Sequence, residues 1–369
     1  MGGDRLAWPH DGLVALGSAL ALDVPDSVLP IRRTQVFPDV HTIFFAPQFD
    51  LPGAEASLHR IGEECIGRLS CGVVPVALSR VPQITIDIAP RVAVTFSSAV
   101  GGLDAVLQAD RLMVKDGKLP YPFTNPNSCI NMVGGKISIL TGATGPICST
   151  ITACATGITS MIIGEMLLQR NMADVVIAGA VDFPLVEPIV AGFATMNGAY
   201  RPKEGQPEEP PEKTSRPFSA NRRGFVVSEG AGCIILATGE FAKVHGLPSG
   251  MEMAGWAMTS DASHFVSPNL ATVRKCIEET IANAGLKPED IDAVNAHATS
   301  TKIGDKVEAD ALKNIFGGHV PPVSANKSQM GHAMGASSAI EAILAMEGMK
   351  KEIVLPTINY DPDPAIVLD

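Results

Sequence analysis

Apolar residues recur along the chain with two different periods, and these divide it into short strands and helices. Continuous apolar runs at 91–96 and 173–180 are typical of strands that a sheet buries on both faces. Between these runs, apolar residues spaced three or four apart predict helices over about 103–114, 127–142 and 155–170. Strands that alternate with helices in this way predict a layered α/β architecture.

The same alternation returns further along the chain, which predicts a second α/β unit. A loop at 203–213, rich in proline and glutamate, separates the first elements from a strand at 226–236. Beyond it we expect strands at 293–296 and near 323, and helices at 271–284, 305–315 and 335–350. We therefore divide the chain into an N-terminal half, 1–248, and a C-terminal half, 249–369.

The pattern is weaker near the N-terminus. Isoleucines alternate with polar residues at 84–88, which predicts a half-buried strand. In 1–80 we expect only a strand at 42–46 and a helix at 54–69, separated by prolines that keep the elements short.

Cys154 occupies the most informative stretch, GPICSTITACATGITSMIIG at 145–164. A strand-like segment at 147–152 leads into a tight turn at Cys154, where the small residues Ala153 and Ala155 permit close backbone approach. A thiol at the N-terminus of the following helix is expected to have a lowered pKa, which favours a nucleophile. The alternative is that Cys154 is a buried, inert cysteine that packs as a small apolar side chain.

Two histidines strengthen the nucleophile hypothesis. His297 lies in NAHATST at 295–301 and His332 in KSQMGHAMG at 327–335, each in a loop of small and hydroxyl residues. Functional sites in α/β folds form at strand ends. A single histidine is often structural, but two such loops together with a cysteine at a turn predict one catalytic site.

Composition excludes several other classes of protein. The 369 residues carry a net charge of −11, which argues against nucleic-acid binding. The seven cysteines show no CxxC spacing, so we expect free thiols, no metal site and a reducing, cytoplasmic location. No apolar stretch predicts a membrane span, and no glycine-rich phosphate motif predicts a bound nucleotide.

In the region 91–369 the sequence resembles the β-ketoacyl synthases, the condensing enzymes of fatty-acid and polyketide assembly. The matching motifs, in family order, are TACATG, ADVVIAGAVD, AGF, RPFSANRRGFVVSEGAG, SDASH, NAHATST, KSQMGHAMGASSAIEA and LPTINY. The resemblance implies a thiolase-like fold of two similar α/β halves in α-β-α-β-α layers.

The resemblance also implies a reaction and the residues that perform it. Cys154 would accept an acyl group from an acyl carrier protein, and a malonyl thioester would then lose carbon dioxide and condense with it. His297 and His332 would stabilise the enolate, while Lys327 and Glu341 would form a charged pair beneath the site.

The remaining expectations from the resemblance concern substrate and partners. Thr299, Thr301 and His264 would bind substrate, the two threonines by holding the pantetheine arm. No cofactor is expected beyond the phosphopantetheine of the carrier protein, and the chain is expected to form a homodimer or a ketosynthase-like heterodimer. A basic patch for the acidic carrier protein is expected from Arg201, Arg216, Arg222 and Arg223.

The sequence departs from the family pattern in three places. Ala298 replaces a glycine, which would cost about 1 kcal/mol if that position needs positive φ. Residues 1–80 lack the family's N-terminal strand and glycine signature, and the sequence ends before the Gly-Phe-Gly-Gly loop. These departures keep open the alternative of a catalytically impaired subunit resembling a chain-length factor. A coenzyme A-dependent thiolase fits less well, because no second cysteine follows Cys276.

Overall fold

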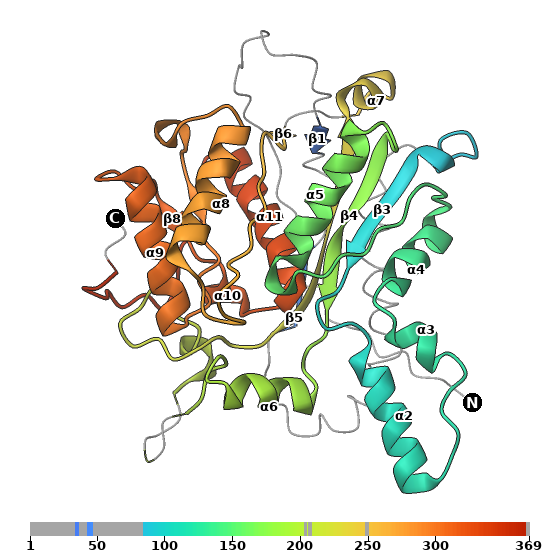
Figure 1. Ribbon diagram of the computed structural model, residues 1–369, viewed down its shortest axis with the longest axis horizontal. Helices are drawn as coiled ribbons and strands as arrows, with labels where there is room; N and C mark the ends of the chain where they lie inside the picture. Colours follow the sequence, from blue (N-terminus) through green and yellow to red (C-terminus); the bar gives the residue numbers. More distant parts are fainter. Residues whose placement is uncertain are drawn as a thin grey trace, which may run out of the picture.

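The computed structural model describes residues 34–36, 43–46, 84–202, 205, 209–247 and 251–366. Its centre is a mixed sheet in the order β3-β4-β5-β1-β6, with β2 also paired to β5 (Figure 1). The strands are β1 (Thr34–Val36), β2 (Ile43–Ala46), β3 (Val92–Ser97), β4 (Val175–Asp182), β5 (Glu229–Thr238) and β6 (Met251–Glu252). The pair β3 and β4 is parallel, with Val92 opposite Val175, whereas β4 and β5 are antiparallel.

Alternate residues of the sheet build two separate apolar layers. On one face, Val92, Val94 and Phe96 pack with Val133 and Ile137 of α4 (Met132–Thr141). On the other face, a second cluster joins Ala93 and Val176 of the sheet to α5 (Thr156–Gln169) and α11 (Met334–Lys351). Every residue of β3 and β4 is buried, and most are apolar; the exceptions include Thr95 and Ser97 of β3 and Asp182 at the end of β4.

Helices α5 and α11 approach each other and the sheet very closely at glycines. A Cβ at Gly157 of α5 would lie 2.5 Å from the backbone nitrogen of Ala339 in α11. A Cβ at Gly232 of β5 would lie 2.9 Å from the same residue. This close approach brings the N-terminal ends of α5 and α11, which carry the catalytic candidates, next to each other.

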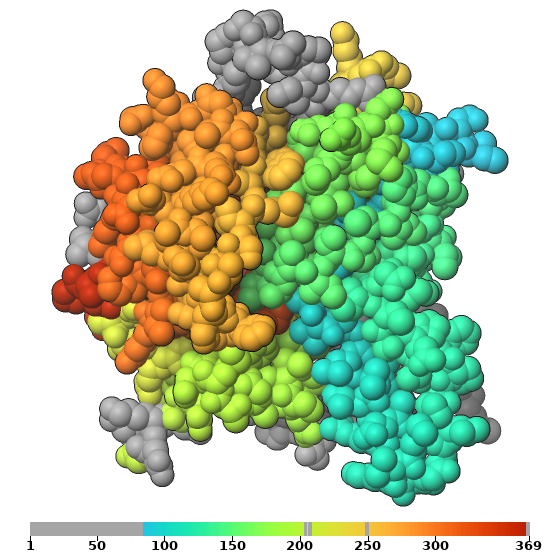
Figure 2. Space-filling view, viewed as in Figure 1, coloured from blue at the N-terminus to red at the C-terminus, as the bar shows by residue number. Residues whose placement is uncertain are grey.

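A second, small sheet and two further helices complete the layers. The parallel pair β7 (Val294–Asn295) and β8 (Val323–Ser324) lies beyond α11, and helices α8 and α9 pack together on its outer side (Figure 1). The C-terminal elements lie directly against α5 on the face shown in Figure 2. The remaining elements are α2 (Leu103–Asp116), α3 (Thr124–Ser128), α6 (Glu187–Thr195), α7 (Gly239–Val244), α8 (Leu270–Asn283), α9 (Lys302–Phe316), α10 (Lys327–Met330), η1 (Ala89–Arg91), η2 (Ala153–Ala155), η3 (Pro211–Lys213) and η4 (Pro288–Asp290).

The long elements agree with the sequence predictions to within a few residues. The expected strand at 42–46 is β2, and the expected helices at 155–170, 271–284, 305–315 and 335–350 are α5, α8, α9 and α11. The helix expected at 54–69 lies outside the described residues.

Three local predictions were wrong. Residues 84–88 form a turn, in which the Thr85 carbonyl accepts the N–H groups of Ile88 and Ala89. The expected helix at 127–142 is split into α3 and α4 at Cys129, whose backbone is extended. The segment 147–152 is not a strand of this sheet; it makes one isolated bridge, between Ile147 and Val94.

In the part of the chain that the structure describes, every helix is too short or too polar to cross a bilayer.

Candidate active site

Cys154 sits in a strained turn at the N-terminal end of α5. The turn is the 3₁₀ segment η2, and Ala153 has a left-handed φ of 49°, which costs free energy for a residue with a Cβ. The Thr156 hydroxyl stabilises the turn by donating to the Ala153 carbonyl at 2.7 Å and accepting the Thr152 N–H at 3.1 Å. The turn presents the Cys154 sulfur, which is only half-buried, beyond the end of the helix.

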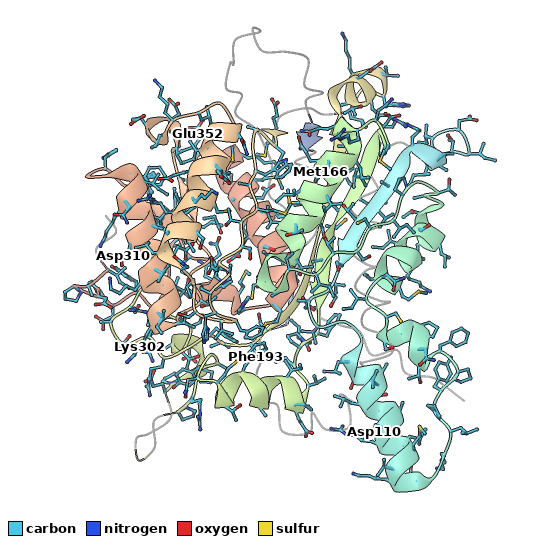
Figure 3. The ribbon with its side chains drawn as sticks, in the orientation of Figure 1. Asp110, Met166, Phe193, Lys302, Asp310 and Glu352 are labelled. Carbon is cyan, nitrogen blue, oxygen red and sulfur yellow. The ribbon has the colours of Figure 1, made fainter. Side chains whose placement is uncertain are left out.

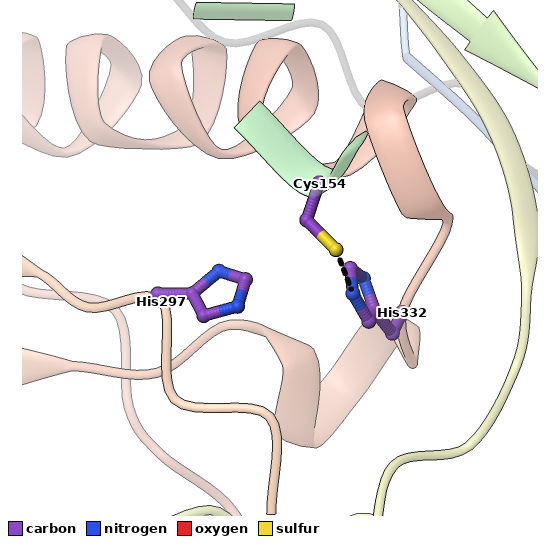
Figure 4. A group of neighbouring side chains, drawn as sticks. All are labelled: Cys154, His297 and His332. Atoms are coloured by element: carbon purple, nitrogen blue, oxygen red, sulfur yellow. Dashed lines mark hydrogen bonds between the residues drawn. The ribbon is translucent and has the colours of Figure 1, made fainter. Parts of the chain in front are cut away.

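His332 lies opposite Cys154 in the loop before α11. Its Nε2 is 3.0 Å from the Cys154 sulfur, a hydrogen-bond distance for a sulfur atom (Figure 4). The ring is buried, and its other nitrogen, Nδ1, lies 2.9 Å from the Ser337 hydroxyl. Phe225 packs edge-on against the ring with centroids 5.2 Å apart. These three contacts fix the imidazole in place beside the thiol.

His297 approaches the same sulfur from the second sheet. The sulfur of Cys154 and one nitrogen from each imidazole all lie within 4.8 Å of one another (Figure 4). The two rings meet edge to face, with centroids 5.7 Å apart. His297 still has surface open to solvent, so it lies at the mouth of the site, whereas His332 lies at its base.

Two carboxylates of α9 hold the His297 loop. Glu308 accepts the backbone N–H of His297 at 2.7 Å and that of Ala298 at 2.8 Å. Asp305, which is fully buried, accepts the N–H groups of Thr299 and Thr301. Burial raises the pKa of both carboxyls, although the backbone donors oppose this shift. The loop therefore owes its shape to acceptors on a neighbouring helix.

Lys327 and Glu341 form a buried ion pair beneath the histidines. The Lys327 ammonium lies 2.6 and 2.7 Å from the two carboxylate oxygens, and its side chain is 1% exposed. The positive charge reaches all three central groups, because it lowers the pKa of Cys154, His297 and His332. Lys327 thus acts on the site through its charge.

The expected low pKa of Cys154 is wrong. Burial raises the pKa of the thiol to about 11, and the Lys327 charge opposes this shift without overcoming it. Desolvation, followed by the Lys327 charge, lowers the pKa of both His332 and His297. At neutral pH the resting site therefore contains a neutral thiol beside two neutral imidazoles, so the nucleophile must lose its proton during the reaction.

Comparison with known proteins shows which family both halves of the chain match. Residues 82–242 match the family model for the β-ketoacyl synthase N-terminal domain, and residues 251–361 match the model for the C-terminal domain. A 3-oxoacyl-[acyl-carrier-protein] synthase 2 of Coxiella burnetii is 35% identical over 287 residues, which cover 76% of this chain and 68% of the relative. The chain belongs to the β-ketoacyl synthase family.

Solved structures agree with this assignment. A β-ketoacyl synthase from Burkholderia phymatum superposes with a TM-score of 0.75 at 28% identity, covering 88% of this chain and 78% of the other. A type II polyketide ketosynthase, solved in complex with its acyl-carrier protein, gives a TM-score of 0.79 at 23% identity, covering 92% and 91%. The fold is therefore the thiolase-like α/β fold of the ketosynthases.

The three expected substrate-binding residues of this ketosynthase differ in their surroundings. Thr299 and Thr301 lie beside His297, and their hydroxyls are 3.1 Å apart. His264 lies in an exposed turn, where its Nδ1 accepts the N–H groups of Val266 and Ser267. The threonines therefore belong to the His297 loop, while the His264 ring nitrogen is used within its own turn.

Two of the four arginines expected on the carrier-protein patch are not on the surface, which corrects that prediction. Arg216 and Arg222 are buried, at 7% and 4% exposure, and they pair with Glu209 and with Asp363 and Asp305 respectively. Arg223 is partly exposed, pairs with Glu209 and lies over the Tyr200 ring. Arg201 is exposed and makes a weak contact with the Ala194 carbonyl.

The Ala298 substitution does not strain the histidine loop as the sequence suggested. Ala298 lacks a positive φ; the left-handed residue of this loop is Ser300, with φ 69°. The Ala298 methyl is buried against Ala296, Ala309 and Phe218. The Cβ that a glycine would lack therefore contributes to packing.

Sequence reasoning missed Asp182, Glu308, Ser337 and Phe225, all of which support the site. Glu308 could have been found, since Asp305 and Glu308 are three residues apart on a helix that follows the His297 loop. The other three act through contacts between distant segments, for which the sequence contains no local signal.

Proposed function

We propose that this chain catalyses the decarboxylating condensation of an acyl group, held on Cys154, with a malonyl group on an acyl carrier protein. The product is a 3-oxoacyl thioester of the carrier protein, in fatty-acid or polyketide synthesis. The observation that supports this most strongly is the convergence of one thiol and two neutral imidazoles within 4.8 Å. The relative with 35% identity, a 3-oxoacyl-[acyl-carrier-protein] synthase 2, is consistent with it.

The first half-reaction loads the enzyme. The Cys154 sulfur attacks the acyl carbonyl while its proton moves to Nε2 of His332, 3.0 Å away. The carbon–sulfur bond to the carrier then breaks, and the departing thiolate takes the proton from His332. A positioned base is needed here, because the thiol is protonated at neutral pH.

The second half-reaction uses the imidazoles as donors. The carbon–carbon bond to the malonyl carboxylate breaks, carbon dioxide leaves, and its electron pair forms an enolate whose oxygen needs preorganised N–H groups. The enolate carbon attacks the acyl-Cys154 carbonyl, the carbon–sulfur bond to Cys154 breaks, and the departing thiolate takes a proton from water. We assign the enolate oxygen to the space between His297 and His332, and the pantetheine arm to Thr299 and Thr301.

Binding partners follow from the same assignment. The exposed Arg201 and partly exposed Arg223 are the remaining candidates to contact an acidic carrier protein, whose phosphopantetheine supplies the only cofactor. We propose a dimer, either of two identical chains or with a related subunit, working in the cytoplasm. The five described cysteines are free thiols, as a reducing compartment requires. The subunit resembling a chain-length factor remains the alternative, and it predicts no turnover by the chain alone.

Product analysis tests the proposal. The purified chain is incubated with an acyl-carrier thioester and malonyl-carrier protein, and the carrier products are analysed by mass spectrometry. We expect a 3-oxoacyl carrier product that the Cys154→Ala variant does not form. A thiol and two imidazoles could also bind zinc, so the assay is repeated with a chelator. We expect activity to survive, because the proposed reaction uses no metal. A chain that binds carrier protein but never yields product would favour the chain-length factor alternative.

A further inference from the structure

Ser337 contacts the one nitrogen of the catalytic imidazole that the reaction leaves unused. Its hydroxyl lies 2.9 Å from Nδ1 of His332, and both residues are 1% exposed. Ser337 lies near the start of α11, beyond Met334, whose left-handed φ of 44° directs the chain from the loop into the helix. Within the described residues, no other hydrogen-bond partner of Nδ1 is found.

The two half-reactions make opposite demands on His332. To receive the thiol proton, Nε2 must be an acceptor, so the proton of the neutral ring must be on Nδ1. To stabilise the enolate, Nε2 must carry the proton, so Nδ1 must be an acceptor. The ring cannot exchange its nitrogens by turning over, because Phe225 packs against it and Nε2 faces the sulfur.

A hydroxyl is the partner that serves both states. It accepts from Nδ1–H in the first tautomer and donates to bare Nδ1 in the second, by rotation of one O–H bond. A backbone carbonyl would fix the first tautomer, and a backbone N–H would fix the second.

We propose that Ser337 is a positioning residue that lets His332 exchange between its two neutral tautomers, so that one imidazole serves both half-reactions. The inference rests on the proposed condensation, whose steps set the two demands. No bond of Ser337 changes during the cycle; only the donor and acceptor in its hydrogen bond with Nδ1 exchange.

The proposal predicts an asymmetric effect of Ser337→Ala. Without the hydroxyl, Nδ1–H would be a buried donor without a partner, which costs more than a bare acceptor. The ring should then favour the Nε2–H tautomer, which donates to Cys154 instead of accepting its proton. Loading of Cys154 should fall about tenfold, which corresponds to about 1.4 kcal/mol, while malonyl decarboxylation should stay within about threefold of the original rate.

The experiment measures the two steps separately at pH 7.5. Loading is followed by the rate at which a short acyl-pantetheine thioester, which needs no carrier protein, transfers its acyl group to Cys154, and decarboxylation by carbon dioxide released from malonyl-carrier protein. Selective ¹⁵N labelling of histidine reports the tautomer of His332 directly. The charged and titratable groups that face this ring, Lys327, His297 and Cys154, are left unchanged in every variant.

Ser337→Thr keeps the hydroxyl and should restore the loading rate. Ser160→Ala is the matched control, because Ser160 is an equally buried serine whose hydroxyl bonds only within α5 at 3.0 Å. Equal losses in both steps, an unchanged loading rate or an unchanged ¹⁵N pattern in Ser337→Ala would overturn the proposal. If the wild-type chain releases no carbon dioxide, the proposed function fails instead, and the acyl-transfer and ¹⁵N data still report on Ser337.

Discussion

The chemistry of Cys154 depends on a balance between burial and one nearby charge. Desolvation raises the pKa of the thiol, and the Lys327 ammonium lowers it by a smaller amount. The position of the cysteine at a helix N-terminus could be read from the sequence, but the depth of the sulfur could not. Its burial comes from the His332 and His297 loops, which lie about 140 to 180 residues further along the chain.

Alkylation of Cys154 should keep accelerating well above neutral pH. Because the pKa is about 11, the thiolate fraction should rise about tenfold per pH unit between about pH 7 and 9. The measurement is the iodoacetamide rate at each pH, with the rate of the Cys154→Ser variant subtracted. A plateau below pH 8 would show that the helix terminus or Lys327 dominates, and would contradict this account.

Breaking the buried Lys327–Glu341 pair should be costly. Lys327→Met leaves the Glu341 carboxylate buried without its partner, so the free energy of unfolding should fall by about 3–5 kcal/mol. Combining it with Glu341→Leu should restore much of that loss, as chemical denaturation would measure. The control is Lys306→Met, which breaks the exposed pair with Asp310 and should change the free energy of unfolding by less than about 0.5 kcal/mol. Equal effects of the two single substitutions would contradict the interpretation.

Whole elements bring the site together, and Asp182 at the end of β4 connects three of them. Its fully buried carboxylate accepts the Ser98 hydroxyl at 2.5 Å, the Ala99 and Val100 N–H groups at 3.1 and 2.9 Å, and the Gly335 N–H at 2.7 Å. It therefore joins β4 and the segment after β3 to the first turn of α11. A second contact comes from α6: Phe193, labelled in Figure 3, packs edge-on against Phe225, which in turn packs against the His332 ring.

Asp182→Asn should weaken both stability and catalysis. The amide NH₂ group would face backbone N–H donors, so the free energy of unfolding should fall by about 1–3 kcal/mol. The Gly335 N–H, which donates to Asp182, lies three residues after His332. Loss of this hydrogen bond should therefore displace the His332 imidazole and lower kcat. Asp174→Asn is the control: Asp174 pairs with Arg91 just before the opposite end of β4, so its loss should lower stability without lowering kcat. An unchanged kcat in Asp182→Asn would show that this contact does not position His332.

The pattern of apolar residues predicted the long elements well, because β3, β4, α5 and α11 are buried on most sides. It failed where distant segments decide the backbone. The extended backbone of Cys129 interrupts the helix expected at 127–142, and the stretch at 147–152 pairs with β3 only through the single bridge at Ile147. In the site, motifs located Cys154, His297, His332, Lys327 and Glu341, while Asp182 and Ser337 required knowledge of contacts across the fold.

Over the whole molecule the net charge is −11, so the proposed docking of an acidic carrier protein would depend on exposed arginines such as Arg201. The sequence analysis grouped four arginines, but Arg216 and Arg222 are buried and form ion pairs inside the protein. Their burial could not be inferred from residue type, because it depends on Asp305, Asp363 and Glu209, which lie in other segments. The candidate docking patch is therefore smaller than the sequence indicated.

Reversing the charge of Arg201 should weaken carrier binding and leave the chemistry intact. We expect Arg201→Glu to raise KM for carrier-bound substrate by about three- to tenfold at low salt, with less effect at high salt and an unchanged kcat. Arg274→Glu is the matched control, because Arg274 is an exposed residue of α8 that pairs within its own helix. Equal KM values for both variants would remove Arg201 from the docking surface.

Intact-mass and peptide analysis after incubation with an acyl-carrier thioester shows which residue of the chain holds the acyl group. The account predicts one acyl group per chain, located on the peptide that contains Cys154, and none on the Cys154→Ala variant. We also expect His332→Ala to slow acyl transfer, although the Cys154 thiol is still present in that variant. An acyl group found on another residue, or retained by Cys154→Ala, would contradict it.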